Sequence, residues 1–197
     1  MRRHLLALAL LGCTALAQAQ EAPLANPSQD ELRALLGAPP KVATTRSFTR
    51  TAPPSTDGAC AGGDPSPATG GGTRSLGVVP YGGAGAANVN LAIQFATGSD
   101  AIAAASQQVL DRLAAVLKEP DMAQRRFAVA GHTDATGEDR INLELSCARA
   151  IAVRKHLLKR GVAAERLSAY GFGSAKPLQQ GAAESAVNRR VEIRRAE

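Results

Sequence analysis

A short stretch of the sequence, GHTDATGEDRINLELSCARA at residues 131–150, brings together residue types that carry out chemistry in proteins. These side chains would suit a metal site, an acid–base catalytic set or a receptor for a charged small molecule. A zinc or iron site needs several converging ligands. His132 and Asp134 supply two at a poor spacing, and the next histidine, His156, lies well downstream. The sequence therefore argues against a resident metal, and no motif indicates another cofactor.

Catalysis is the second interpretation of this stretch. Asp134, Glu138 and Asp139 lie close together, but the last two fall at a predicted helix start, where carboxylates stabilise the exposed amides. Ser146 has no histidine at the spacing of a catalytic pair, and no nucleophile elbow surrounds it. The residues therefore indicate a protein that is not an enzyme.

A receptor for a zwitterion is the third interpretation. Asn142 and Arg149 are seven positions apart in a predicted helix, so both project from the same stripe of it. Arg149 is a permanent cation suited to bidentate carboxylate recognition, and Asp134, in the preceding loop, offers an acceptor for an ammonium group. An Asp134–Arg149 ion pair that merely braces the loop fits the spacing equally well, so both interpretations stay open at this point.

The elements that must position these residues follow from hydrophobic periodicity. It predicts strands at 88–95, 125–131, 166–173 and 188–196, and helices at 99–119, stopped by Pro120, and at roughly 138–160, ending at Gly161. The resulting order, β-α-β-α-β-β, predicts an α+β fold. We expect a two-layer sandwich in which the helices pack on one mixed sheet.

The N-terminal part of the chain has a different character. Residues 1–19 are typical of a secretory signal peptide, whereas a second interpretation makes Cys13 the lipidated residue of a lipobox. Residues 20–87 are predicted to form a flexible Pro/Gly-rich, disordered arm, with a short helix near 28–37 that we expect to be mobile rather than docked. Cys60 and Cys147 form a disulfide or remain two free thiols; the sequence leaves both open.

Composition narrows the range of partners. The formal net charge is +6, which favours anionic surroundings. Aromatic residues make up 3% of the chain and tryptophan is absent, which argues against the stacking platforms of single-stranded nucleic-acid grooves. Together with the export signal, this composition argues against nucleic acid as a partner.

The central stretch and its continuation resemble the OmpA C-terminal-like, peptidoglycan-binding domain family over about residues 88–196. The matching positions are Gly131-His132-Thr133-Asp134, Gly137, Asn142, Leu145-Ser146, Arg149-Ala150, Val153, Leu157, Gly161, Arg166, Gly171-Phe172-Gly173, Pro177 and Asn188-Arg189-Arg190-Val191-Glu192. The resemblance makes residues 88–197 the peptidoglycan-binding domain of this chain.

The resemblance also implies a ligand and roles for individual residues. Such domains bind the diaminopimelate of peptidoglycan stem peptides without cutting it. Asp134 would then take the ligand's ammonium group and Arg149 its carboxylate, and Asn142 would shape the pocket. The other residues implied are Thr133 and Thr136 in the loop, and Asn188, Arg189 and Arg190 in the segment that closes the site; the resemblance does not say which of the two arginines faces the ligand.

The expected function is therefore non-catalytic attachment to the cell wall. We expect a periplasmic protein associated with the outer membrane, through a lipid on Cys13 or through a protein partner. The alternatives are a periplasmic cell-wall-modifying enzyme and an accessory subunit of an envelope complex. His132 and Cys147 are expected to play no part in the site.

Overall fold

The computed structural model describes residues 22–39, 59–60, 79–83 and 85–196. The predicted signal peptide and Cys13 lie outside these residues, as does most of the predicted arm. Within the described part, no helix combines the length and the apolar character needed to cross a membrane. The elements are α1 (Gln29–Gly37), β1 (Asn88–Leu91), α2 (Ala104–Leu117), β2 (Phe127–His132), α3 (Asp139–Lys159), a 3-10 turn (Ala164–Arg166), β3 (Leu167–Gly171), a second 3-10 turn (Ala186–Asn188) and β4 (Arg190–Arg195).

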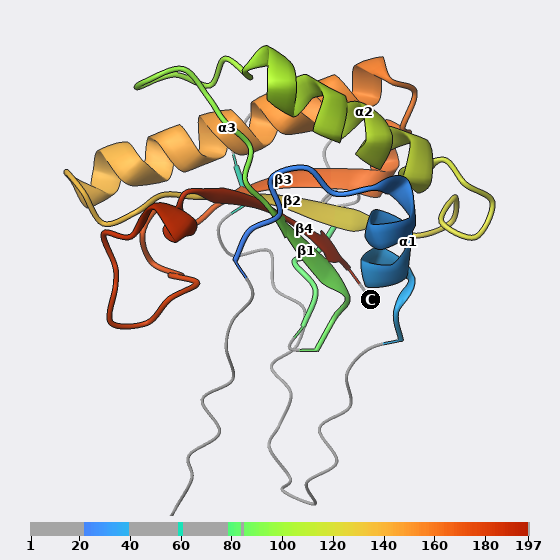
Figure 1. The fold of residues 1–197 in the computed structure, drawn as a ribbon, viewed down its shortest axis with the longest axis horizontal. Helices are drawn as coiled ribbons and strands as arrows, with labels where there is room; N and C mark the ends of the chain where they lie inside the picture. Colours follow the sequence, from blue (N-terminus) through green and yellow to red (C-terminus); the bar gives the residue numbers. More distant parts are fainter. Residues whose placement is uncertain (1–21, 40–58, 61–78, 84, 197) are drawn as a thin grey trace, which may run out of the picture.

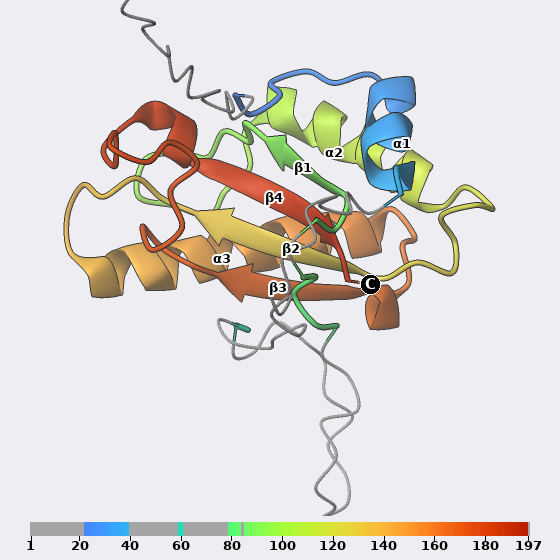
Figure 2. The same ribbon diagram turned by 90° about the horizontal axis from the view of Figure 1, so that it is seen from below.

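Four strands form one mixed sheet in the order β1-β4-β2-β3. β2 and β3 run parallel, as a strand–helix–strand connection through α3 requires, and β4 runs antiparallel to both of its neighbours. Helices α2 and α3 cover one face of the sheet (Figures 1 and 2). The predicted α+β sandwich, with its element order and mixed sheet, is confirmed.

The connection between β1 and α2 differs from the prediction. β1 ends at Leu91 rather than at Phe95, and α2 begins at Ala104 rather than near residue 99. The intervening loop folds back on itself, because the Ser106 hydroxyl accepts a hydrogen bond from the Gln94 amide (2.9 Å). Phe95 therefore lies in a loop beside the start of α2.

Two glycines let α3 lie against the sheet. A Cβ atom on Gly131 would lie 2.1 Å from the Ser146 carbonyl oxygen, and one on Gly171 would lie 2.5 Å from Cys147 Sγ. At the same contact, the Gly173 amide donates a hydrogen bond to Ser146 Oγ (2.9 Å). These contacts fix where the first turns of α3 stand relative to the ends of β2 and β3.

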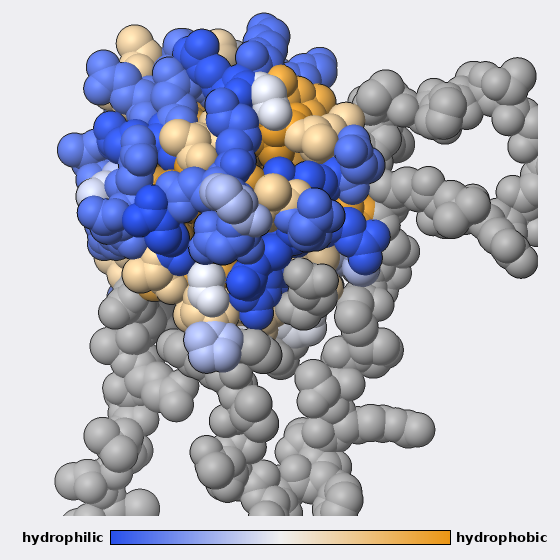
Figure 3. Space-filling view, turned by 90° about the vertical axis from the view of Figure 1, so that its right-hand side faces the viewer, coloured by the Kyte–Doolittle hydropathy of each residue, from blue (hydrophilic) through white to orange (hydrophobic). Residues whose placement is uncertain are grey.

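Helix α1 is docked rather than mobile, so that part of the prediction for the N-terminal arm is wrong. Leu32 and Leu36 are fully buried in the main hydrophobic core. Arg33 forms a salt bridge to Glu119 just beyond the end of α2 (2.5 Å), and the preceding chain pairs Leu24 with Leu91 on the outer edge of β1. Figure 3 shows the side of the molecule on which α1 lies: most of it is hydrophilic, with a smaller hydrophobic area.

The opposite edge of the sheet is also covered. Ala59 pairs antiparallel with Tyr170 of β3, and Cys60 forms a disulfide with Cys147 of α3, with 5.6 Å between their Cα atoms. This contact shields the free edge of β3, an exposed strand edge being a site for unwanted pairing. The disulfide resolves the question that the sequence left open, and Cys147 is therefore a structural residue rather than an incidental one.

Residues 79–83 cover the sheet face that the helices leave open. Val79 is held by Ser168 and Tyr170 of β3, through hydrogen bonds of 2.8 and 2.6 Å. Tyr81 donates a hydrogen bond to the carboxylate of Glu192, which is buried in β4 (2.8 Å). Parts of the predicted arm thus pack on both faces and both edges of the domain.

Candidate ligand-binding site

The loop that carries Asp134 connects β2 to α3 and is held from several sides. The Thr136 amide donates to Asp134 Oδ1 (3.2 Å), which closes a tight local turn. Asn142, in the first turn of α3, donates from its side chain to the Thr136 carbonyl (3.1 Å). The Ala135 amide donates to the Ala183 carbonyl of a distant loop (3.0 Å). Asn142, buried to 7% exposure, therefore shapes the loop by bracing its backbone.

Asp134 forms an ion pair across this loop. Its Oδ2 lies 2.5 Å from Arg189 Nη1, and its side chain is 12% exposed. Burial on its own would raise the pKa of Asp134, but the hydrogen bonds from Arg189 and from the Thr136 amide outweigh it and keep the pKa below its usual range. Asp134 is therefore a carboxylate at neutral pH.

Arg149 lies one turn further along α3 than the Ser146 contact. Its Nε donates to the Ser99 carbonyl (3.2 Å), and its guanidinium carbon lies 4.9 Å from the centre of the Phe95 ring. Within the described residues it forms no salt bridge, so its terminal nitrogens keep their capacity for a carboxylate. Partial burial lowers the pKa of Arg149, the positive charge of Arg189 lowers it further, and the charge of Asp134 opposes both.

The simple Asp134–Arg149 brace that the spacing allowed is not what the structure contains. Asp134 pairs with Arg189, while Arg149 is held by a backbone carbonyl and an aromatic ring. The positive charge of Arg189 lowers the pKa of both Asp134 and Arg149, and the negative charge of Asp134 raises the pKa of Arg149. The resulting arrangement is one buried carboxylate with two arginines around it.

The C-terminal segment separates into three different roles. Asn188 is fully buried; its Oδ1 accepts from the Leu178 and Gln179 amides and its Nδ2 donates to two further carbonyls. Arg190 is 6% exposed and bonds to Asn90 of β1 (2.9 Å). Arg189 keeps 52% of its side chain exposed and is the arginine that faces Asp134. Of these three predicted ligand residues, the geometry brings only Arg189 to the site, whereas Asn188 and Arg190 organise the segment behind it.

The two threonines of the loop also differ. Thr133 is buried, its amide donates to the Gly173 carbonyl (2.9 Å), and its hydroxyl has no partner within the described part of the chain. Thr136 is exposed at the rim of the loop. His132 lies below the loop on the opposite sheet face, stacked on Phe172 with 5.5 Å between ring centres. His132 therefore lies on the sheet face away from α3.

Sequence reasoning missed the residues that hold Arg149. The hydrophobic pattern predicts a strand at Phe95 and a helix at Ser99, whereas both residues lie in the loop before α2. Their contribution comes from a ring face and a backbone carbonyl, and neither leaves a spacing signal in the sequence. Ser146, which we considered as a nucleophile, instead accepts from the Gly173 amide and donates to the Leu143 carbonyl (2.8 Å).

Metal ligands do not converge in this part of the molecule. Across residues 22–39, 59–60, 79–83 and 85–196, no group of three or more histidine, cysteine or acidic side chains is placed to hold a metal ion. The Asp134 carboxylate and the guanidinium groups of Arg149 and Arg189 instead suit a ligand that carries a positive and a negative charge close together.

Comparison with known proteins gives a consistent family assignment. The sequence model of the OmpA family matches residues 94–190. The chain is 50% identical over 66 residues to outer membrane porin F of Pseudomonas fluorescens, a match covering 32% of this chain and 20% of the relative. It is 38% identical over 104 residues to peptidoglycan-binding protein ArfA of Mycobacterium bovis, covering 51% of this chain and 31% of the relative. The matches thus span less than a third of either relative.

Two solved structures are similar to part of this chain. One is the cell wall anchor of the type VI secretion system (T6SS) from Pseudomonas aeruginosa, at 31% identity and a TM-score of 0.47, covering 56% of this chain and 81% of that one. Another is the peptidoglycan-associated lipoprotein from Burkholderia pseudomallei, at 29% identity and a TM-score of 0.45, covering 53% and 86%. The family match contains Asp134, Asn142 and Arg149 and extends to Arg190. Residues 94–190 of this chain are therefore a domain of the OmpA family.

Proposed function

We propose that the domain formed by residues 88–197 binds peptidoglycan, without cutting it, through the diaminopimelate of the stem peptides. The observation that carries this proposal is the placement of two unlike charges at one site. Asp134 is kept ionised in the β2–α3 loop, and Arg149 is held by Ser99 and Phe95 with no salt bridge among the described residues. The peptidoglycan-binding relative ArfA supports the same ligand class.

The end of a diaminopimelate side chain has the matching chemistry. It carries an ammonium and a carboxylate on one carbon atom, so the two charges lie within a few bonds of each other. The carboxylate would lie against the terminal nitrogens of Arg149, which suit bidentate contact. The ammonium would bind Asp134, sharing the carboxylate with Arg189, whose side chain is 52% exposed.

The proposed location follows from the ligand. A wall-binding domain acts in the periplasm, and a membrane attachment through Cys13 or through a protein partner would link the outer membrane to the wall. Such an attachment would reach the domain through residues 22–39, which pack against its core, and through the Cys60–Cys147 disulfide.

Co-sedimentation with purified peptidoglycan tests this proposal. Asp134→Asn and Arg149→Gln should each lose most of the protein in the pellet, because the ligand would bury one charge without its partner at a cost of about 2–5 kcal/mol. Asp121→Asn and Arg140→Gln are matched controls that remove the same charges from exposed positions, and both should pellet like the wild type.

A comparison of two types of cell wall tests whether the domain recognises diaminopimelate or peptidoglycan in general. Walls that carry lysine in place of diaminopimelate lack the side-chain carboxylate that Arg149 would bind, so they should retain much less protein. Equal binding to both wall types would contradict the diaminopimelate assignment, and equal pelleting of all variants would contradict the site. Release of soluble muropeptides during the incubation would show that the protein is a wall-modifying enzyme instead.

A further inference from the structure

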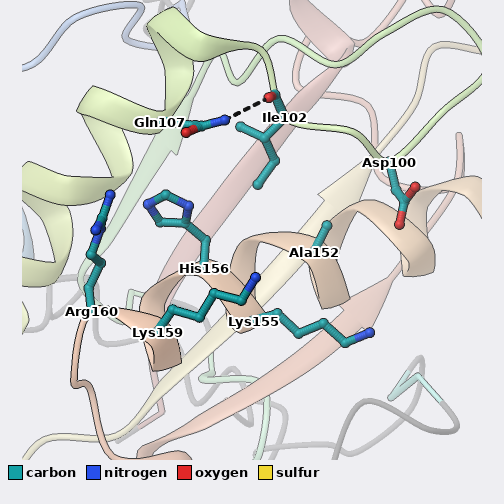
Figure 4. A pocket seen from close by; sticks show the side chains of 8 residues that line it. All are labelled: Asp100, Ile102, Gln107, Ala152, Lys155, His156, Lys159 and Arg160. Carbon is teal, nitrogen blue, oxygen red and sulfur yellow. Dashed lines mark hydrogen bonds between the residues drawn. The ribbon is translucent and has the colours of Figure 1, made fainter.

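A hollow between α2 and α3 lies beside the proposed site, and its lining residues take no part in that site. It lies between the start of α2 and the C-terminal half of α3 and has a volume of ≈ 420 Å³. Figure 4 shows Asp100 at one end and Arg160 at the other, with Lys155 and Lys159 along α3 between them. The side chains of Ile102 and Ala152 give this hollow an apolar wall.

Lys155, Lys159 and Asp100 are the charged side chains of the hollow for which the described residues supply no partner. His156 and Arg160 both contact the Asp111 carboxylate of α2, at 2.7 and 2.6 Å. Lys155 and Lys159, by contrast, form no hydrogen bond or ion pair with any residue that the structure describes. The hollow therefore carries two positive charges along α3 that a ligand can neutralise, and one negative charge, Asp100, at the end near Arg149.

The hollow continues directly from the proposed site. Arg149 bonds to the carbonyl of Ser99, and the next residue, Asp100, borders the hollow. Arg149, Ala152 and His156 lie on one stripe of α3, at the three- and four-residue spacings that share a helix face. With a rise of about 1.5 Å per residue, the two lysines lie roughly 9 and 15 Å along the helix from Arg149.

We propose that this hollow, the lysine groove, is a second subsite that binds a free carboxylate of the same wall peptide. The proposal rests on the proposed function, since it places the diamino acid at Asp134 and Arg149. An extended peptide advances about 3.3–3.6 Å per residue, so a carboxylate a few residues from the diamino acid reaches the lysines. Asp100 at the near end disfavours a densely charged polyanion such as a phospholipid surface.

Calorimetric titration with three soluble ligands tests the lysine groove. The ligands are free diaminopimelate, a stem peptide whose carboxylates a few residues from the diaminopimelate are free, and the same peptide with those carboxylates amidated. The double variant Lys155→Gln/Lys159→Gln should bind free diaminopimelate and the amidated peptide like the wild type. It should bind the free-carboxylate peptide about 2- to 30-fold more weakly, the range for two exposed ion pairs.

A control variant removes the same charge elsewhere. Lys118→Gln/Arg126→Gln alters two exposed cations that line a different hollow, and it should bind all three ligands like the wild type. Equal weakening in both double variants would show a general charge effect and would overturn the lysine groove. Undiminished binding of the free-carboxylate peptide by Lys155→Gln/Lys159→Gln would overturn it too.

The same titrations distinguish a failure of the diaminopimelate site from a failure of the lysine groove. If the wild type binds all three ligands and the lysine variant behaves identically, the diaminopimelate site stands and the lysine groove alone is wrong. If the wild type binds none of them, both proposals are wrong. Loss of binding to phosphatidylglycerol vesicles in the lysine variant, with peptide binding intact, would make the groove a lipid-contact surface and overturn the proposal.

Discussion

Replacing Leu32 by alanine tests whether α1 is part of the folded unit. The Leu32 side chain is fully buried against the main core, so truncation removes its buried methyl groups and leaves a cavity. Substitutions of this kind cost about 2–5 kcal/mol. A docked helix therefore predicts a loss of about 3 kcal/mol in the free energy of unfolding, whereas a mobile helix predicts no loss.

Urea denaturation of the full chain, with its disulfide intact, measures this difference. For a slope of about 1–3 kcal/mol per molar urea, the expected loss lowers the midpoint by roughly 1–3 M. Gln29→Ala, at an exposed position of the same helix, is the control and should change the stability by less than about 0.5 kcal/mol. If Leu32→Ala and Gln29→Ala unfold at the same urea concentration, α1 does not belong to the cooperative unit.

Three other predictions concern the disulfide, the buried histidine and the segment behind the site. Reduction of the Cys60–Cys147 disulfide, which joins residues 87 positions apart, should lower the free energy of unfolding by up to about 4–5 kcal/mol. Adding reductant should therefore lower the melting temperature of the wild type, whereas it should not change the melting temperature of a Cys60→Ser variant. Burial lowers the pKa of His132, despite an opposing effect of Glu192, so the unfolded chain takes up the proton first. The free energy of unfolding should therefore fall as the pH drops below about 6.5, and His132→Gln should flatten this dependence; an unchanged slope would contradict the assignment. Asn188→Ala removes the four hydrogen bonds that hold the segment before Arg189, and it should weaken peptidoglycan binding although its side chain does not reach the ligand; binding equal to the wild type would exclude this positioning role.

The sequence by itself determined the elements and their order. Local signals were sufficient, because a helix or strand shows its period within a few residues, and its end is marked by residues such as Pro120 or Gly161. The same local signals placed Asp134 in a loop and Arg149 on the helix that follows it. The boundaries differ where the chain folds back on itself, as between β1 and α2, where the Ser106 hydroxyl accepts a hydrogen bond from the Gln94 amide.

Only the tertiary structure decided which charges meet. Asp134 and Arg189 are 55 positions apart, and Arg149 and Ser99 are 50 apart, so neither contact leaves a spacing pattern in the sequence. The sequence leaves open which arginine faces Asp134, because the burial of Arg190 beside Asn90 of β1 and the exposure of Arg189 just before β4 follow from the packing of the sheet.

The same reason explains the N-terminal segment. Its composition is that of a linker, and the short helix with Leu32 and Leu36 is too short to be stable in isolation. Whether such a helix folds depends on the surface it meets, and that surface is built by α2, β1 and the end of β4, far along the chain. The sequence thus specified the helix, and the packing of the whole domain decided that the helix is part of it.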